Sequence, residues 1–277
     1  MTVILALCAA AFYGVADYSG SRGARLAHAA SITFLGQAVA CVFIGFFLLF
    51  AQTPVMPAES WMWTTGGGFG GAIALVAFYQ AMSKGSMTVI APITAVIGLS
   101  VPVLAGVLQG ERPSSLAWFG IAIAVVAVAL VGDVLDRHDL PTSMSAIWMA
   151  VAAGFGFGMI FVCMGNASHD HGVWPLFGQR LVSVPTVAAI ALLQTRSISV
   201  PKNVFLLSIA AGVLDTSANG LYLLATSAEL MSIVSVVVAM YPVATIFLAM
   251  TLDHERLHKS QGVGLLLAIT SLVLISI

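Results

Sequence analysis

The sequence predicts an all-α integral membrane protein of about ten transmembrane helices, arranged as two inverted five-helix repeats. The first observation is composition: 60% of the 277 residues are hydrophobic and only 8% are charged. Soluble domains carry about 25% charged residues. Lipid is therefore the expected solvent for most of this chain, and a net charge of −1 indicates no nucleic-acid partner.

The second observation is a series of ten apolar stretches separated by short connections rich in polar residues, proline or glycine. Each stretch approaches the roughly 20 residues that a helix needs to span a bilayer. The longest polar connection follows residue 132 and leaves five spans on each side, in residues 1–132 and 143–277. The predicted spans are 2–21, 31–51, 62–82, 87–108, 115–133, 143–165, 172–194, 203–226, 230–251 and 260–277.

The third observation is that the two halves resemble each other when the sequence is shifted by 144 residues. Glu111-Arg112 then falls on Glu255-Arg256, and Tyr13-Gly14 falls on Phe157-Gly158. Because five spans is an odd number, two such repeats in series face opposite ways across the membrane. Inverted repeats are common in secondary transporters, with the substrate site at the repeat interface. A duplication in a non-transporting protein is the alternative.

A few short motifs point to a known family. Gly110-Glu111-Arg112 precedes the fifth span, and Glu255-Arg256 precedes the tenth. Tyr241-Pro242 lies in the ninth span, and Ala11-Phe12-Tyr13-Gly14 in the first. Together these motifs resemble the EamA family of the drug/metabolite transporter superfamily, although His254 replaces the glycine of the second turn.

The resemblance implies a secondary transporter, mainly an exporter, of a small metabolite such as an amino acid or an amphipathic compound. It implies alternating access in a bacterial cytoplasmic membrane and no enzymatic activity. The expected partners are the small-molecule substrate and the lipid bilayer, with coupling to protons as a further expectation. Since no nucleotide motif is present, neither ATP nor another cofactor is expected.

The side of the membrane on which the termini lie is open. The family implies cytoplasmic termini, whereas the positive-inside rule applied to the connections places both termini outside. The connection between the fourth and fifth spans carries Arg112, on the side of the termini. The connections on the opposite side carry Arg22, Arg25, Lys84, Arg137, Arg196, Lys202, Arg256 and Lys259.

Ionisable side chains inside spans are candidate functional residues, because each costs about 2.5–3.5 kcal/mol at the helix centre. Asp215 lies in the eighth span, with two polar residues four and seven positions later on the same helix face. Arg180 lies in the seventh span, and Asp17 near the end of the first. The candidate substrate-binding or coupling residues are Asp215, Arg180, Asn219, Tyr222, Gln179, Asp17 and Tyr13.

These residues are expected to line a polar cavity between the repeats. Arg180 would offer a positive fork to a carboxylate or phosphate. An aspartate in apolar surroundings can exchange protons, so Asp215 could couple transport to a proton gradient. The alternative for these two residues is a structural ion pair that holds neighbouring helices together. The alternative for Asp17 is a position at the membrane interface.

Glycines and prolines give further expectations about the spans. The run Gly66–Gly71 lacks the Gly-Lys-Ser/Thr end of a phosphate-binding loop. Its four-residue spacings, like that of Gly154 and Gly158, predict close helix packing instead. The prolines expected to interrupt helices are Pro92, Pro102, Pro185 and Pro242.

One motif favours a different function, that of a membrane-embedded zinc enzyme. His254-Glu255-Arg256-Leu257-His258 has the spacing of two zinc-binding histidines with a glutamate as general base. We expect a transporter rather than this enzyme, because the repeat partner Glu111-Arg112 has no histidines and the motif lies in a short connection. The loop at His169–His171, which could supply another ligand, would lie on the opposite membrane face.

Overall fold

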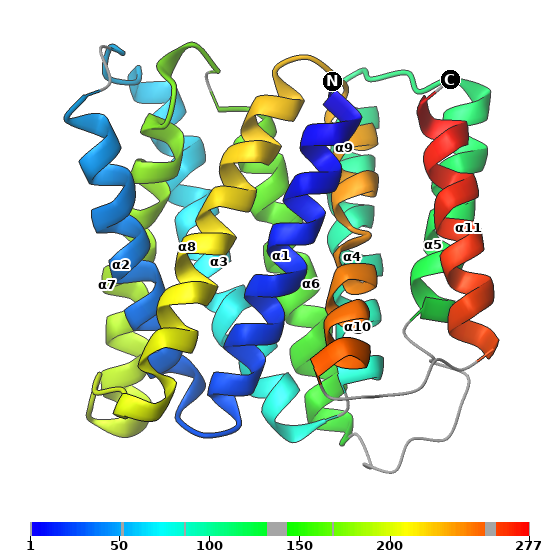
Figure 1. The fold of residues 1–277 in the computed structure, drawn as a ribbon. Helices are drawn as coiled ribbons and strands as arrows, with labels where there is room; N and C mark the ends of the chain where they lie inside the picture. Colours follow the sequence, from blue (N-terminus) through cyan, green and yellow to red (C-terminus); the bar gives the residue numbers. More distant parts are fainter. Residues whose placement is uncertain are drawn as a thin grey trace.

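Helices are the regular secondary structure of the residues that the computed structural model describes (Figure 1). Twelve helical elements follow one another in that part of the chain. They are α1 (Thr2–Ala24), α2 (Ala29–Leu48), α3 (Ala58–Lys84), α4 (Met87–Leu108), α5 (Ser115–Val131), α6 (Met144–Gly165), η1 (His169–His171), α7 (Trp174–Thr195), α8 (Lys202–Thr226), α9 (Met231–Val238), α10 (Tyr241–Leu252) and α11 (Lys259–Ser276). The described residues are 2–50, 53–85, 87–131, 143–167, 169–252 and 259–276.

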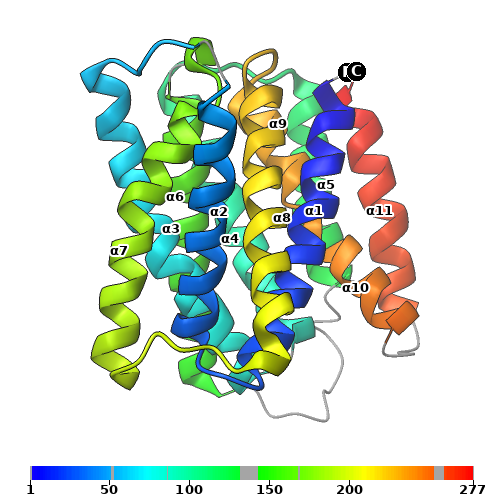
Figure 2. The same ribbon diagram turned by 60° about the vertical axis from the view of Figure 1, so that its left-hand side comes forward.

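The helices form one bundle in which long helices run side by side, with both termini at the same end (Figures 1 and 2). Among the described residues, six helices are long and apolar enough to cross a membrane, and shorter apolar helices accompany them. The surface of the bundle is apolar: Leu108 is 87% exposed and Leu193 is 85% exposed. A surface formed by such apolar side chains is stable in contact with lipid rather than water, which confirms an integral membrane protein.

The ninth predicted span, over 230–251, is interrupted near Pro242, as the sequence predicts. It is divided into α9 and α10 at Ala239-Met240, directly before Tyr241-Pro242. Pro242 has no N–H to donate to the carbonyl of Val238, and its ring does not fit beneath the preceding helical turn. The break therefore has a direct cause in the sequence.

The other three prolines do not interrupt their helices, contrary to the sequence expectation. α4 continues through Pro92 and Pro102, and α7 continues through Pro185. Neighbouring helices and local adjustment can accommodate proline in a membrane helix. Proline alone therefore does not determine where a span breaks.

Glycines allow α6 to pack closely between α3 and α4, as their spacing predicts. A Cβ atom at Gly154 would lie 2.7 Å from the Cβ of Ile97 on α4. A Cβ at Gly156 would lie 2.6 Å from the Cβ of Ala74 on α3. Larger residues at these positions would push the helices apart, which agrees with the role of small residues in membrane helix packing.

Contacts between the two halves are reciprocal. In the alignment of the halves, α1 corresponds to α6 and α3 corresponds to α8. α1 packs on α8, and correspondingly α3 packs on α6. In the same way α2 packs on α8 and α3 on α7, while α5 packs on α11. The close approach of Gly36 and Gly212 between α2 and α8 has its counterpart between α3 and α7, where a Cβ at Gly68 would lie 2.7 Å from the Gln179 carbonyl oxygen.

Candidate functional site

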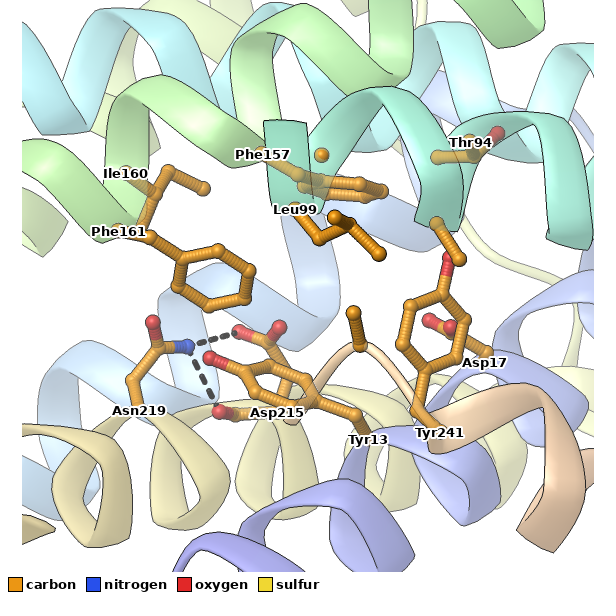
Figure 3. A pocket seen from close by; sticks show the side chains of 13 residues that line it. Tyr13, Asp17, Thr94, Leu99, Phe157, Ile160, Phe161, Asp215, Asn219 and Tyr241 are labelled. Carbon is orange, nitrogen blue, oxygen red and sulfur yellow. Dashed lines mark hydrogen bonds between the residues drawn. The ribbon is translucent and has the colours of Figure 1, made fainter. Parts of the chain in front are cut away.

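One cavity, called here the aromatic cavity, lies between α1, α4, α6, α8 and the break after α9 and has a volume of about 480 Å³, which includes space open to the surroundings. Both halves of the chain therefore contribute to its wall. Figure 3 shows aromatic rings around it, with two carboxylates and an amide beside them. Its labelled lining residues are Tyr13, Asp17, Thr94, Leu99, Phe157, Ile160, Phe161, Asp215, Asn219 and Tyr241.

A second space, called here the polar cavity, adjoins the first and encloses about 280 Å³ between α2, α3, α6, α7 and α8. The two cavities share four lining residues, Phe157, Ile160, Asp215 and Asn219. Asp215 and Asn219 therefore lie at the boundary between them. The further residues of the polar cavity include Gln37, Gly67, Gly68, Gly71, Gln179, Arg180 and Ser183.

A buried ion pair joins α7 to α8 at the polar cavity. Arg180 Nη2 donates to Asp215 Oδ2 over 2.7 Å, and the two side chains are 7% and 14% exposed. Arg180 also donates from Nη1 to Gln37 Oε1 over 2.6 Å and from Nε to Thr216 Oγ1 over 3.1 Å. The Ser183 hydroxyl donates to the same Gln37 oxygen over 2.7 Å. The ion pair that the sequence offered as an alternative is therefore present, and it lines a cavity.

Asn219 holds the Asp215 carboxylate from one turn further along α8. Its Nδ2 donates to the Asp215 backbone carbonyl over 2.7 Å and to Asp215 Oδ2 over 3.3 Å (Figure 3). One carboxylate oxygen thus accepts hydrogen bonds from both Arg180 and Asn219. Shared acceptance of this kind fixes a carboxylate in one orientation.

Asp17 lies inside the bundle, on the wall of the aromatic cavity, and is only 7% exposed. Within the described part of the chain it has no ion-pair partner. Tyr13, one turn earlier on α1, lines the same cavity and meets Phe161 edge-on, with ring centroids 6.0 Å apart. Asp17 therefore differs from Asp215, whose charge is balanced by Arg180.

Gln179 lines the polar cavity and is 3% exposed. Among the described residues its Nε2 has no hydrogen-bond partner. The backbone of Gly67 lies close to this amide, since a Cβ there would be 2.6 Å from Nε2. A shift of 142 residues, two fewer than the shift that relates the halves elsewhere, aligns Gly36-Gln37 with Gly178-Gln179, so each half supplies one glutamine to this cavity.

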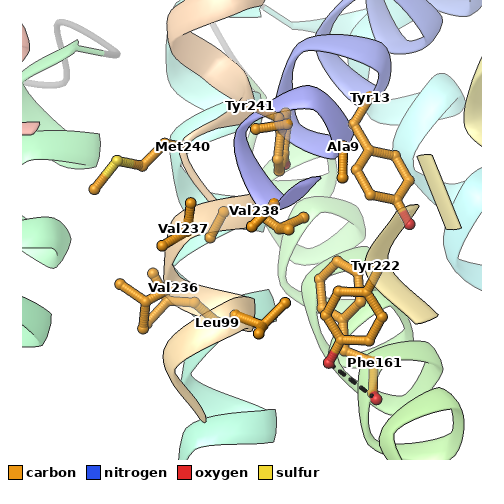
Figure 4. Close-up of a cluster of buried hydrophobic side chains, with 14 of the residues drawn as sticks. Ala9, Tyr13, Leu99, Phe161, Tyr222, Val236, Val237, Val238, Met240 and Tyr241 are labelled. Carbon is orange, nitrogen blue, oxygen red and sulfur yellow. Dashed lines mark hydrogen bonds between the residues drawn. The ribbon is translucent and has the colours of Figure 1, made fainter. Parts of the chain in front are cut away.

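Tyr222 is not among the residues that line the two cavities, although it shares a helix face with Asp215. It is fully buried, and its ring stacks on Phe161 with centroids 4.7 Å apart. Its hydroxyl donates to the Phe161 carbonyl over 3.2 Å and lies 2.9 Å from the Ser235 hydroxyl. It belongs to the hydrophobic cluster behind the aromatic cavity (Figure 4).

Several residues that line the cavities or bind Arg180 were missed from the sequence. Gln37 and Thr216 bind Arg180, and Phe157, Phe161 and Tyr241 line the aromatic cavity. The repeat alignment contained a signal for two of them. The shift of 144 residues that carries Tyr13 to Phe157 also carries Asp17 to Phe161, so equivalent positions of α1 and α6 face the same cavity.

Glu111 connects the two halves through the start of α9. The connection between α4 and α5, which carries it, lies at the end of the bundle where the termini lie (Figure 1). Glu111 Oε1 accepts from the Met231 backbone N–H over 2.8 Å, and its Oε2 from that of Ser232 over 3.0 Å. These groups begin α9, where helical N–H groups lack internal partners and a negative charge is favoured. Its repeat counterpart, Glu255, lies outside the described residues.

The motif His254-Glu255-Arg256-Leu257-His258 also lies outside the described residues, so the structure does not test it as a zinc site. Among the residues that are described, no group of three or more His, Cys, Asp and Glu could hold a metal. His171 is engaged elsewhere, with Nδ1 2.9 Å from the Pro54 carbonyl oxygen. Its loop and the end of α10 are at opposite ends of the bundle (Figure 1).

A bundle of membrane-spanning helices with buried charged residues between its halves is typical of polytopic membrane transporters. The model of the EamA-like transporter family matches residues 1–132 and 144–277. The chain therefore belongs to the EamA-like transporter family and is a membrane transporter. Membership in a family of transporters agrees with the expectation that the protein is not an enzyme.

The chain is also similar to individual proteins. The "Uncharacterized transporter sll0355" of Synechocystis sp. is 30% identical over 83 residues, an alignment that covers 30% of this chain and 24% of that protein. A solved crystal structure shares the fold, with a TM-score of 0.74 and 12% identity over 96% of this chain and 94% of that one. The bacterial relative agrees with a place in the cytoplasmic membrane.

Proposed function

We propose that the protein is a secondary transporter that exports a small metabolite, such as an amino acid or an amphipathic compound, by alternating access. The observation that carries this proposal is the pair of adjoining cavities at the interface of the halves, which contain buried charges. Charged side chains are costly inside a membrane, and they mark substrate or ion pathways. Arg180 and Asp215 would form the substrate-binding or coupling centre.

The proposed moving units are two inverted repeats, residues 1–132 and 143–277. The reciprocal packing of α1 on α8 and of α3 on α6 supports them, because a two-fold relation between halves produces such pairs. The sequence similarity at a shift of 144 residues supports the same relation. Rocking of one repeat against the other would then open the cavities to alternate sides.

The broken ninth span supports the same proposal. Ala239, at the break between α9 and α10, lines the aromatic cavity. Discontinuous helices beside a central site are common in secondary transporters, where they allow one half of a helix to move without the other. Glu111, which holds the start of α9, would stabilise one of the two closed ends.

Proton coupling is the second part of the proposal. Asp215 and Asp17 both face the cavities, and a carboxylate in an apolar interior can take up and release a proton during the transport cycle. Asp215 has Arg180 as a permanent counter-ion, whereas Asp17 has no ion-pair partner among the described residues. Asp17 would therefore change protonation more readily.

The proposal is tested by transport in proteoliposomes with Asp215→Asn and Arg180→Gln. Both variants are expected to lose counterflow of any substrate that the wild type carries. Lys202→Ala is the matched control, because it removes an exposed charge at the start of the helix that carries Asp215. Normal counterflow by both cavity variants would show that the ion pair is no part of the transport site.

A further inference from the structure

We propose that the aromatic cavity binds the positively charged head of an organic amine, with Asp17 as its counter-ion. The inference rests on the proposed transport function and specifies its substrate class. It concerns a monovalent ammonium compound with an apolar body, rather than a zwitterionic amino acid. The observations that carry it are the charge balance of the cavity walls, the aromatic rings and the state of Arg180.

The charge balance of the two cavities is negative when Asp17 is ionised. Their charged lining residues are Asp17, Asp215 and Arg180. Arg180 is within 2.7 Å of Asp215 and compensates it. Asp17 remains, 7% exposed, and no cation in the described part of the chain pairs with it. A buried carboxylate without a partner is costly, and a bound cation would remove this cost.

Aromatic rings complete the surroundings of Asp17. Tyr13, Phe157, Phe161 and Tyr241 line the same cavity, and Figure 3 shows their rings with Asp17 behind Tyr241. The face of an aromatic ring attracts ammonium groups, and cages of such rings are a common way to recognise them. The same rings can also pack against an apolar ligand body. The cavity therefore favours one group with a positive charge and another that is hydrophobic.

The guanidinium of Arg180 is not free to bind a ligand carboxylate. It already donates to Asp215, Gln37 and Thr216. An entering carboxylate would have to compete with these partners, and it would lie near two aspartates of its own sign. This arrangement selects against amino acids relative to the amines that lack their carboxylate.

A suitable probe is a monocyclic aromatic amine, which has one ring for the four aromatic side chains and one ammonium group for Asp17. Phenethylamine is a suitable probe because two close analogues serve as comparisons. Phenylalanine differs from it only by an added carboxylate, and 2-phenylethanol has a neutral hydroxyl group in place of the ammonium group.

The test is the binding of these three probes to the purified full-length protein, measured by thermal stabilisation and calorimetry. Phenethylamine is expected to stabilise the wild type, and both phenylalanine and 2-phenylethanol to bind at least about tenfold more weakly. Asp17→Asn is expected to lose at least about tenfold in affinity for phenethylamine. Asp170→Asn, which neutralises an exposed aspartate outside the cavity, is the matched control and is expected to bind normally.

Equal binding of phenethylamine and 2-phenylethanol, or of phenethylamine and phenylalanine, would overturn the inference, and this comparison needs no variant to fold. Unchanged binding of phenethylamine to Asp17→Asn would overturn it as well. Counterflow separates this failure from that of the proposed function. Transport of a neutral or anionic metabolite that is unaffected by Asp17→Asn contradicts the amine inference alone. Amine binding without transport of any compound contradicts the transport function alone.

Discussion

Removing one partner of the Arg180–Asp215 pair is expected to destabilise the protein far more than removing both. Arg180→Met leaves Asp215 buried without its counter-ion and deprives Gln37 and Thr216 of a donor. Breaking a buried ion pair from one side costs about 3–5 kcal/mol, because the remaining charge is uncompensated. Asp215→Asn in turn leaves Arg180 buried without its counter-ion. Each single variant is therefore expected to lose about 3–5 kcal/mol of unfolding free energy.

The double variant Arg180→Met/Asp215→Asn contains neither charge. Its loss of stability is expected to be smaller than either single loss, and smaller than the sum of the two single losses by about 5 kcal/mol or more, because replacing a whole buried pair is often close to neutral. Reversible unfolding in mixed micelles, followed by the fluorescence of the 5 tryptophans, measures this difference. The control combines Lys202→Met with Asp215→Asn, whose effects should be additive since Lys202 is exposed.

The same three variants separate stability from transport. If the pair serves the substrate, the double variant is expected to fold nearly as well as the wild type and still lose counterflow. Single losses that add up to the double loss would refute the physical reasoning about the pair. A stable double variant with normal transport would instead show that the pair only holds α7 to α8.

Three further outcomes follow from other parts of the structure. Glu111→Ala removes two charge-assisted hydrogen bonds at the start of α9 and should lower the unfolding free energy by about 1–3 kcal/mol. Glu111→Gln should lower it by less. An unchanged unfolding free energy in Glu111→Ala would contradict the interaction. Gly212→Ala should lower the unfolding free energy by about 1–3 kcal/mol, because its Cβ would meet the backbone of Gly36. Gly262→Ala is the control and should leave the unfolding free energy unchanged, since no atom lies within 4 Å of the added Cβ. Equal effects of the two substitutions would count against close packing of α2 and α8. Elemental analysis of the purified protein should find zinc well below one atom per chain, and a value near one would support the zinc-enzyme alternative at His254 and His258.

The spans were predictable from the sequence because the length and apolarity of a bilayer-crossing helix are fixed by the bilayer itself. The break at Pro242 was predicted, but so were breaks at Pro92, Pro102 and Pro185 that do not occur, since the sequence shows each of them only as a proline in an apolar run. An apolar run does not report how neighbouring helices satisfy the carbonyl that a proline leaves without a donor. Tertiary packing decides between the two outcomes.

The site residues were predictable where an apolar environment makes a charged side chain costly. Arg180, Asp215 and Asp17 stand out for this reason, and all three line the cavities. Phe161 does not stand out, because an aromatic side chain is equally stable against lipid. Tyr222 shares a face with Asp215, but seven residues of helix separate the two by about 10 Å along the axis, which carries Tyr222 past the cavity into the core.

The account depends most directly on whether the protein moves a small solute across a membrane. Counterflow of labelled metabolites into proteoliposomes that contain the purified protein measures this, with and without a pH gradient. We expect uptake that depends on unlabelled substrate inside, is lost in Asp215→Asn and persists in Lys202→Ala. Absence of counterflow for every metabolite pool, in either condition, would contradict transport by this protein.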